Sequence, residues 1–268
     1  MSSLSISAAW DQTKAILARD GKLLAAVALA LVVLPQTVFA VVGAPVGPQS
    51  SGLSIITYFV VILLGCAAQI SLNRLAVGPP VTVGSAMSTG FKRLPSVAAV
   101  GVLVAIAVMV LAIALLLILS AAHLVTVPSA GQAPPPALLL LLIVIVALVF
   151  AMFQLVFPLA AVETGNPLRL IARAWALSRH HYLRLLGFVV IIFVGLSLIV
   201  VAVQMGLGSV IVLGLGKPNP GSLSALAIGI ISGLVQAGFT VVTAVMIARM
   251  YTQLSGRDAQ PGVPNSGI

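Results

Sequence analysis

Acidic residues are scarce in this 268-residue chain, which contains four Asp and Glu against thirteen Lys and Arg. All charged residues together make up 6% of the sequence, whereas a soluble globular domain has about 25%. This composition excludes a soluble protein. The four carboxylates also lie in separate segments of the chain, so they offer no paired acids for acid–base catalysis.

Cysteine and histidine are almost as scarce, which leaves little from which to build a metal or cofactor site. Cys66 is the single cysteine, so it cannot form an internal disulfide, and we expect it to pack within its apolar block. His180 and His181 are neighbours that point about 100° apart on a helix, unlike two metal ligands four residues apart. We therefore expect no metal, no cofactor and no enzyme activity. The weakest alternative is a membrane hydrolase that pairs His123 with Ser209.

What the chain has in abundance is apolar sequence, because 61% of its residues are hydrophobic. The apolar residues form blocks of about twenty or more without a charge, the length that an α-helix needs to cross a membrane. The sequence therefore predicts an all-α integral membrane protein with six transmembrane helices. The fifth block is longer than a plain span, so we expect its helix to tilt, or to break near residues 204–208. The spans are expected at 23–42, 53–72, 97–122, 137–162, 185–213 and 222–248.

The basic residues fall almost entirely on one side of this six-span arrangement. Twelve of the thirteen lie on the side of the two chain ends, and Lys217 alone lies on the other. Because basic loops stay in the cytoplasm, both termini are predicted to be cytoplasmic. This orientation accounts for the net charge of +9, and nucleic acid is not expected as a partner.

Each cytoplasmic segment before an odd-numbered span carries apolar residues at helical spacing. A helix with such a face lies in the membrane interface and turns its polar face to water. We therefore expect three interfacial amphipathic helices, with Trp10, Trp175 and Tyr182 as anchors at the level of the lipid headgroups. The apolar faces are Ile6, Trp10, Thr13 and Leu17 in the first segment, Val83, Met87, Phe91 and Leu94 in the second, and Leu168, Ile171, Trp175 and Tyr182 in the third.

The third segment is the most basic of the three. Asn166 followed by Pro167 is typical of the N-cap and first position of a helix. Each Arg near an anionic leaflet contributes about 1 kcal/mol to membrane binding. The candidate contacts for phospholipid headgroups or for a partner are Arg169, Arg173, Arg179, His180 and Arg184.

An interfacial helix followed by a two-helix hairpin occurs three times, at residues 1–76, 77–163 and 164–254. We interpret residues 1–254 as a single membrane domain built from three repeats. The alternative is an ordinary hairpin protein whose linkers are amphipathic. Residues 255–268 are expected to form a short, flexible cytoplasmic tail.

The predicted spans contain no formal charge, but they do contain amides and small residues. Gln69 and Gln154 are expected toward the cytoplasmic side, Gln204 toward the outer side, and Gln236 near the middle of the sixth span. Such amides form hydrogen bonds between helices, or, as we consider for Gln236 and Gln154, they line a path for an uncharged substrate. The small residues recur at intervals of four on the sixth span and predict close helix packing there: Ala225, Gly229, Gly233 and Ala237.

The stretch VETGNPLRLIARAWALSRHHYLRLLGFVVI, residues 162–191, resembles bacterial integral membrane proteins of the glycerophosphoryl diester phosphodiesterase membrane-domain family. The resembling features are a small polar turn, a helix with RAW and LSR, and a span that follows at once. The N-terminal AAWDQTKAILARDGKLLAAVALAL is similar to the element that begins such proteins. The resemblance implies a membrane module of the bacterial inner membrane, without the soluble phosphodiesterase domain that some members carry, and it brings no activity with it.

We expect a non-catalytic inner-membrane protein that organises lipid or protein partners at the cytoplasmic leaflet. Its expected partners are phospholipids of that leaflet, together with a membrane protein or a second copy of the chain. The alternative is a carrier or channel for an uncharged or lipid-like molecule, in which the glutamines would line the path.

Overall fold

The structure, a computed structural model, describes residues 5–42, 52–77, 81–122, 136–163 and 165–256. These residues form helices and short connections, with no β-strand among them. Six helical runs are long and apolar enough to cross a membrane, which agrees with the predicted class and number of spans. The predicted repeats stay a prediction, and the predicted tail lies from residue 257 onward outside the described residues. The six runs are Ile6–Val42, Ile55–Val77, Val83–Ala121, Leu139–Val162, Tyr182–Leu215 and Leu223–Ser255.

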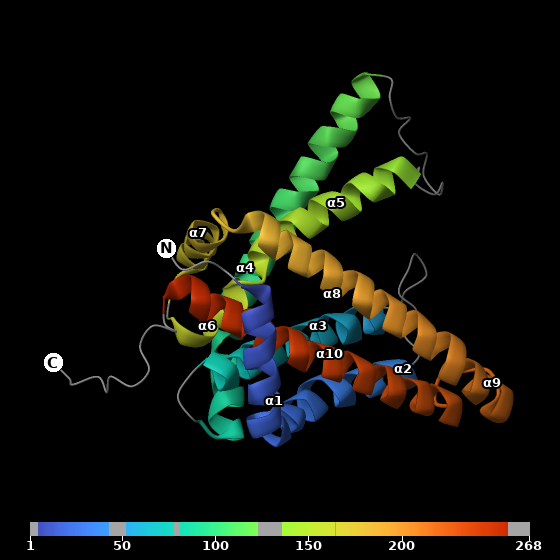
Figure 1. Cartoon of the computed structure of the whole chain (residues 1–268). Helices are drawn as coiled ribbons and strands as arrows, with labels where there is room; N and C mark the ends of the chain where they lie inside the picture. The colour runs from blue at the N-terminus through green and yellow to red at the C-terminus, as the bar shows by residue number, and fades with distance from the viewer. Residues whose placement is uncertain (1–4, 43–51, 78–80, 123–135, 164, 257–268) are drawn as a thin grey trace.

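The helices carry the labels of Figure 1. In chain order they are α1 (Ile6–Ala28), the π-helical stretch η1 (Leu29–Val33), α2 (Leu34–Val42), α3 (Gly52–Val77), α4 (Val83–Ala121), α5 (Pro136–Phe153), α6 (Val156–Val162), α7 (Pro167–Ser178), α8 (Tyr182–Val203), the π-helical stretch η2 (Gln204–Gly208), α9 (Ser209–Leu215) and α10 (Leu223–Ser255).

Three of the long helices have a residue with a hydroxyl side chain at the N-cap. The side chains of Ser5, Thr82 and Ser222 each accept a hydrogen bond from the backbone N–H three residues further on, at 3.2–3.3 Å. These N-caps satisfy donors that have no partner within the first helical turn. At its other end α10 stops at Gly256, whose φ of 70° is the left-handed conformation that glycine adopts without strain.

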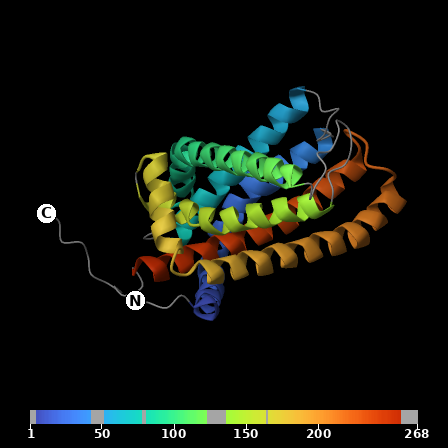
Figure 2. The same ribbon diagram turned by 90° about the horizontal axis from the view of Figure 1, so that it is seen from above.

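The first two predicted interfacial segments are continuous with the spans that follow them. One helical run extends from Ile6 to Val42, and α4 extends from Val83 to Ala121 through Pro95. In both runs the first part lies at an angle to the rest (Figures 1 and 2). Lys and Arg are good helix formers, so the basic sequence at the start of each run continues the helix and does not end it. Only the third segment, α7, is a separate helix.

The fifth span continues through the segment where a break was considered. Residues 204–208 form η2, a π-helical stretch between α8 and α9, so the helix is modified there and is not interrupted. The connection after α9 turns at Gly216 and Gly221, which have φ values of 83° and 75°. The N–H of Gly221 donates to the carbonyl of Val41 at 2.8 Å. This hydrogen bond connects the turn to the end of α2.

The last helix, α10, is the central helix of the bundle. It packs against α1, η1, α2, α3, α6, α8 and α9. The outer parts of α4 and α5 project away from it, as Figure 1 shows, and their large apolar side chains are exposed for contact with lipid. Helix α10 contributes to two clusters of buried apolar side chains, one mainly with α4, α6, α7 and α8 and the other with α1, η1 and α3. The bundle is therefore tightest around α10.

Small residues let the helices approach closely at two places. A Cβ atom at Gly233 would lie 3.1 Å from the Cα of Val33 in η1, and one at Gly229 would lie 2.8 Å from the Cβ of Ala40 in α2. All four residues of the predicted small-residue face on α10 are buried. Gly90 of α4 is equally close to α3, because a Cβ atom there would lie 2.7 Å from the carbonyl oxygen of Ala67. At these contacts the helix backbones pack directly against one another, without lipid tails between them.

Candidate functional site

The basic helix α7 lies against α4, α5 and α6. Its buried face consists of Leu170, Ala174 and Ser178, spaced by four residues. Two residues of the predicted apolar face point away from the protein, since Leu168 and Trp175 are 70% and 55% exposed. Small residues face the protein, and the two large apolar side chains face outward, where membrane lipid would surround them.

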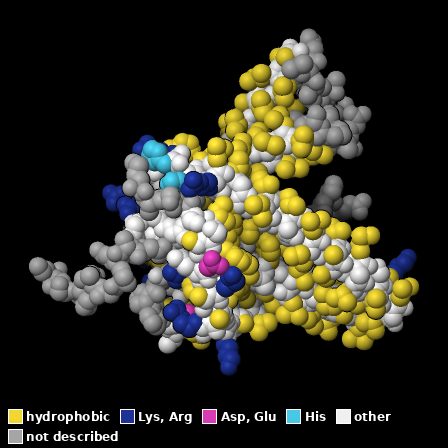
Figure 3. Space-filling view, in the orientation of Figure 1, with side chains coloured by type: hydrophobic (Ala, Val, Ile, Leu, Met, Phe, Trp, Pro, Cys, Tyr) yellow, Lys and Arg dark blue, Asp and Glu magenta, His cyan; other side chains and the backbone are white. Residues whose placement is uncertain are grey.

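The candidate cations are all exposed, but they do not belong to one helix. Asn166 and Pro167 occupy the predicted N-cap and first position, although the Asn166 side chain makes no capping hydrogen bond. Helix α7 ends at Ser178, so the two following candidates lie in a turn and Arg184 lies on α8. Figure 3 shows basic and histidine side chains gathered at the end of the molecule where α7 lies, beside a largely hydrophobic remainder. Lys217 follows α9, the helix labelled at the end of the molecule opposite α7 in Figure 1.

Arg173 has a partner within the protein. Its Nε lies 3.1 Å from Oε2 of Glu163, which follows α6. The other carboxylate oxygen, Oε1, accepts a hydrogen bond from the hydroxyl of Tyr251 at 3.4 Å. This arrangement joins α7 to α10 through Glu163, so Arg173 positions α7 in addition to presenting charge.

Two other candidate cations make a local contact. The Nε of Arg179 donates to Nε2 of His180 at 3.1 Å, and both side chains are exposed. Arg169, one turn before Arg173, is also exposed and has no ion-pair partner among the residues that the structure describes. Arg169 and Arg179 are therefore the cations of α7 and its turn that are best placed for an external anion.

The predicted aromatic anchors differ from one another. Trp10 and Trp175 are exposed, as an anchor in the membrane interface requires. Tyr182 is half-buried, and its hydroxyl donates to the carbonyl oxygen of Leu148 in α5 at 2.7 Å. Tyr182 thus joins α8 to α5, a role that the sequence pattern did not indicate.

Arg249 of α10 forms a hydrogen bond with the C-terminal end of α3. Its Nη2 donates to the backbone carbonyl of Ala76, which lies in the last turn of α3. Carbonyls in the last turn of a helix have no partner within that helix, so a cation there supplies a needed hydrogen bond.

Replacing Arg249 with Gln should therefore destabilise the protein. The shorter amide cannot keep the charge-assisted hydrogen bond to Ala76, and the expected loss is about 1.5–3 kcal/mol. The thermal midpoint of unfolding in detergent measures the effect. Lys92→Gln, which removes an exposed cation from α4, should leave the midpoint nearly unchanged; equal shifts in the two variants would contradict this role for Arg249.

The second candidate site is a groove that brings predicted glutamines together. Gln69 of α3, Gln154 after α5 and Gln236 of α10 line one cavity of about 230 Å³. Gln154 is 3% exposed. The remaining walls are largely apolar and come from α5, α6, α8 and α10: Phe150, Phe157, Val189, Ile192, Leu196, Phe239 and Ile247.

A neighbouring cavity of about 360 Å³ shares part of this lining. Both cavities are lined by Gln69, Gln236 and Thr240, and the neighbouring cavity adds Gln36 of α2. Thr243 completes the polar lining of the first cavity. The sequence analysis missed Gln36, Thr240 and Thr243. Spacing offered a signal for the threonines, because residues 236, 240 and 243 recur on one helix face.

Two polar atoms in this region are buried and have no hydrogen-bond partner among the residues that the structure describes. They are the side-chain oxygen Oε1 of Gln69 and the hydroxyl of Thr243, which is 9% exposed. A buried polar atom without a partner is costly in an apolar environment. The groove is therefore a candidate site for a molecule that supplies both a donor and an acceptor.

Ser209, His123 and Cys66 are the remaining candidates for hydrolase or metal chemistry. The hydroxyl of Ser209 donates to the carbonyl of Met205, and His123 lies outside the described residues. In the part of the chain that the structure describes, no three His, Cys, Asp or Glu side chains gather as metal ligands would. Cys66 is a half-buried free thiol.

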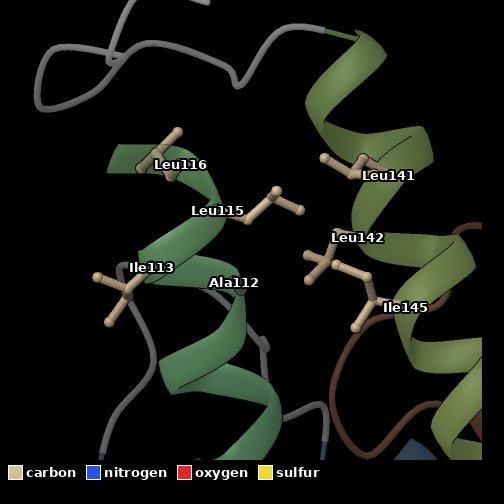
Figure 4. A pocket seen from close by; sticks show the side chains of 7 residues that line it. All are labelled: Ala112, Ile113, Leu115, Leu116, Leu141, Leu142 and Ile145. Atoms are coloured by element: carbon tan, nitrogen blue, oxygen red, sulfur yellow. The ribbon is translucent and has the colours of Figure 1, made fainter. Parts of the chain in front are cut away.

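A gap between α4 and α5 has only apolar lining. Figure 4 shows leucine and isoleucine side chains from the two helices on either side of it. None of these residues offers a side-chain hydrogen bond, so the gap is suited to hydrocarbon and not to a polar ligand. Its lining residues are Ala112, Ile113, Leu115, Leu116, Leu141, Leu142 and Ile145.

Comparisons with known proteins gave one finding. A family model with the description Domain of unknown function (DUF7847) matches residues 4–254. No curated protein and no solved structure gave a match. The family match gives no support to the resemblance to the glycerophosphoryl diester phosphodiesterase membrane-domain family.

Proposed function

The chain belongs to the DUF7847 family, which brings no activity with it, and we propose that it is a non-catalytic bacterial inner-membrane protein that organises anionic phospholipid at the cytoplasmic leaflet. The docking surface consists of α7 and the turn after it. In this orientation both termini are cytoplasmic, as the distribution of the basic residues favours.

The observation that carries the proposal is the exposure of Arg169, Trp175 and Arg179 on α7 and the turn after it. Guanidinium groups bind phosphate through paired hydrogen bonds, and an indole ring suits the level of the headgroups. Leu168, exposed on the same helix, supplies the apolar contact that an interfacial helix makes with acyl chains. Cation, aromatic and apolar side chains thus occur together, as phospholipid binding requires.

The position of α7 also supports a fixed docking surface. Arg173 pairs with Glu163, and Leu170 and Ala174 are buried against the bundle. A helix that is held in this way presents its free cations in one orientation, so binding does not require the helix to order first.

The test is the retention of phosphatidylglycerol by the purified full chain, measured by native mass spectrometry after gentle delipidation. We expect the double variant Arg169→Gln, Arg179→Gln to bind this lipid about tenfold to thirtyfold more weakly, since two cations contribute about 2 kcal/mol. Added salt should weaken binding to the parent protein more than to the variant.

The matched control is the double variant Lys22→Gln, Lys92→Gln, which removes the same charge from exposed positions outside α7. We expect it to keep most of the lipid. An equal loss in both double variants would mean that binding follows net charge, and the α7 surface would be refuted. Unchanged lipid retention with loss of a co-purifying protein would assign the surface to a protein partner and would also refute the lipid proposal.

A further inference from the structure

The groove lined by glutamines lies within the membrane-spanning part of the bundle, and none of its lining residues belongs to α7. Gln69 and Gln236 belong to α3 and α10, two of the six candidate spans. Gln236 is exposed although it lies in the interior of α10. An amide exposed at such depth would face hydrocarbon, which cannot form hydrogen bonds with it.

The two cavities are arranged as two lobes of one region. They share Gln69, Gln236 and Thr240, and their volumes are about 230 and 360 Å³. Each lobe has room for several water molecules at about 30 Å³ each, and thus for the polar head of a small lipid. The combined region is larger than interhelical hydrogen bonding alone would require.

The polar atoms specify the chemistry of an occupant. Among the described residues, Oε1 of Gln69 and the hydroxyl of Thr243 have no partner, and both atoms are hidden from the cavity surface, so each side chain rotates to meet an occupant. An occupant with a hydroxyl group can donate to Gln69, and an occupant with a carbonyl can accept from Thr243 or from a glutamine amide. A hydrocarbon chain satisfies neither atom.

The lining also excludes charge. Of the described residues that line either lobe, none is an Asp, Glu, His, Lys or Arg. An ion within the membrane needs a counter-charge or a dense set of dipoles, so an uncharged head suits this site. The apolar walls of the first lobe, among them Phe157 and Leu196, suit the tail of the same molecule.

We propose that these two lobes form an intramembrane binding site for a neutral lipid whose head carries a free hydroxyl and an ester carbonyl, as in a diacylglycerol. The lipid donates its hydroxyl to Gln69 and accepts from Thr243 or Gln154, and its acyl chains lie along the apolar wall toward α8. It enters from the bilayer, because Gln236 is exposed on the lipid-facing surface of α10. The site is independent of the headgroup surface on α7, and it stands whether or not the bound lipid is carried across the membrane.

The experiment is photo-crosslinking of the full chain in nanodiscs with a diacylglycerol that carries a diazirine on one acyl chain. Peptide mapping should find the label on residues that line the lobes, on α3, α5, α6, α8 or α10. Unlabelled diacylglycerol should compete for the site. Its O-acetyl ester, which has no hydroxyl to donate to Gln69, should compete at least tenfold more weakly.

The variant that tests the site is Gln154→Leu, Thr243→Val. It replaces two polar side chains with apolar ones of similar size, so folding should be unchanged or improved while specific labelling falls at least tenfold. Thr243→Ser keeps the hydroxyl and should retain labelling. The thermal midpoint of each variant, measured in parallel, separates loss of the site from loss of the fold.

The headgroup variant Arg169→Gln, Arg179→Gln serves as the matched control and should be labelled like the parent chain. Unchanged labelling in Gln154→Leu, Thr243→Val would overturn the proposal. So would a label away from the residues that line the two lobes, or no competition by unlabelled diacylglycerol, which would leave only water in the lobes. Loss of labelling in the arginine variant alone would show that the probe reports the α7 surface and would equally overturn the site.

Discussion

Replacing Gly233 with Leu will strongly destabilise the bundle. Even a single Cβ atom at this position would lie 3.1 Å from the Cα and 3.2 Å from the carbonyl oxygen of Val33, so backbone must move to accommodate it. Overpacking of a tight interior costs about 1–3 kcal/mol, and a full leucine side chain should exceed that range. We expect a large decrease in the thermal midpoint in detergent and a lower yield of folded protein.

The matched control is Gly238→Leu on the same helix. Gly238 is exposed, and a Cβ atom there would meet no atom within 4 Å. Replacing a helical glycine lowers the backbone entropy lost on folding, so this variant should be neutral or more stable by up to about 1 kcal/mol. If the two leucines have the same effect, the contact between α10 and η1 does not hold the bundle together as described.

The second large effect is expected for Tyr251→Ala. Tyr251 is 1% exposed and lies in the apolar cluster formed mainly with α4, α6, α7 and α8. Truncation of a buried aromatic side chain leaves a cavity and costs about 3–5 kcal/mol. It also removes the hydroxyl that donates to Glu163, and therefore loosens the connection between α10 and α7. The measurement is again the thermal midpoint of the purified full chain.

Two further variants divide this effect into its parts. Tyr251→Phe removes only the hydroxyl, and it should lose about 1 kcal/mol, since the hydrogen bond at 3.4 Å is long. Tyr58→Ala truncates an exposed tyrosine of α3 and should change stability little. A loss in Tyr58→Ala as large as that in Tyr251→Ala would mean that burial in the cluster is not the cause.

Sequence alone was sufficient for the class of the protein and for the number of spans, because uncharged apolar runs of this length are typical of membrane-spanning helices. It did not indicate which face of α7 packs against the protein. The large apolar residues Leu168 and Trp175 face outward, whereas Ala174 and Ser178 face the protein. In water the large apolar side chains would be buried. Lipid tails are as apolar as leucine, so large apolar side chains gain little by leaving the lipid. Close packing of small residues therefore determines which side chains form the interior of the bundle.

The candidate groove was only partly predictable, for a related reason. Each glutamine is visible in the sequence as an amide within an apolar span, and the positions of Thr240 and Thr243 relative to Gln236 follow helical spacing. That α3, α5 and α10 meet at these residues depends on contacts between distant segments, which helical periodicity does not report. The pairing of Arg173 with Glu163 was missed for the same reason.

The central position of α10 has a consequence for the order in which the bundle assembles. The backbone N–H of Ser5 donates to Oε1 of Gln253 at 3.1 Å, so the start of the first helix rests on the end of the last. Synthesis proceeds from the N-terminus, so α1, η1 and α2 are made well before α10, the helix against which they pack. These helices can therefore reach their final packing only after α10 has been made, and the close contacts at Gly229 and Gly233 form at that point.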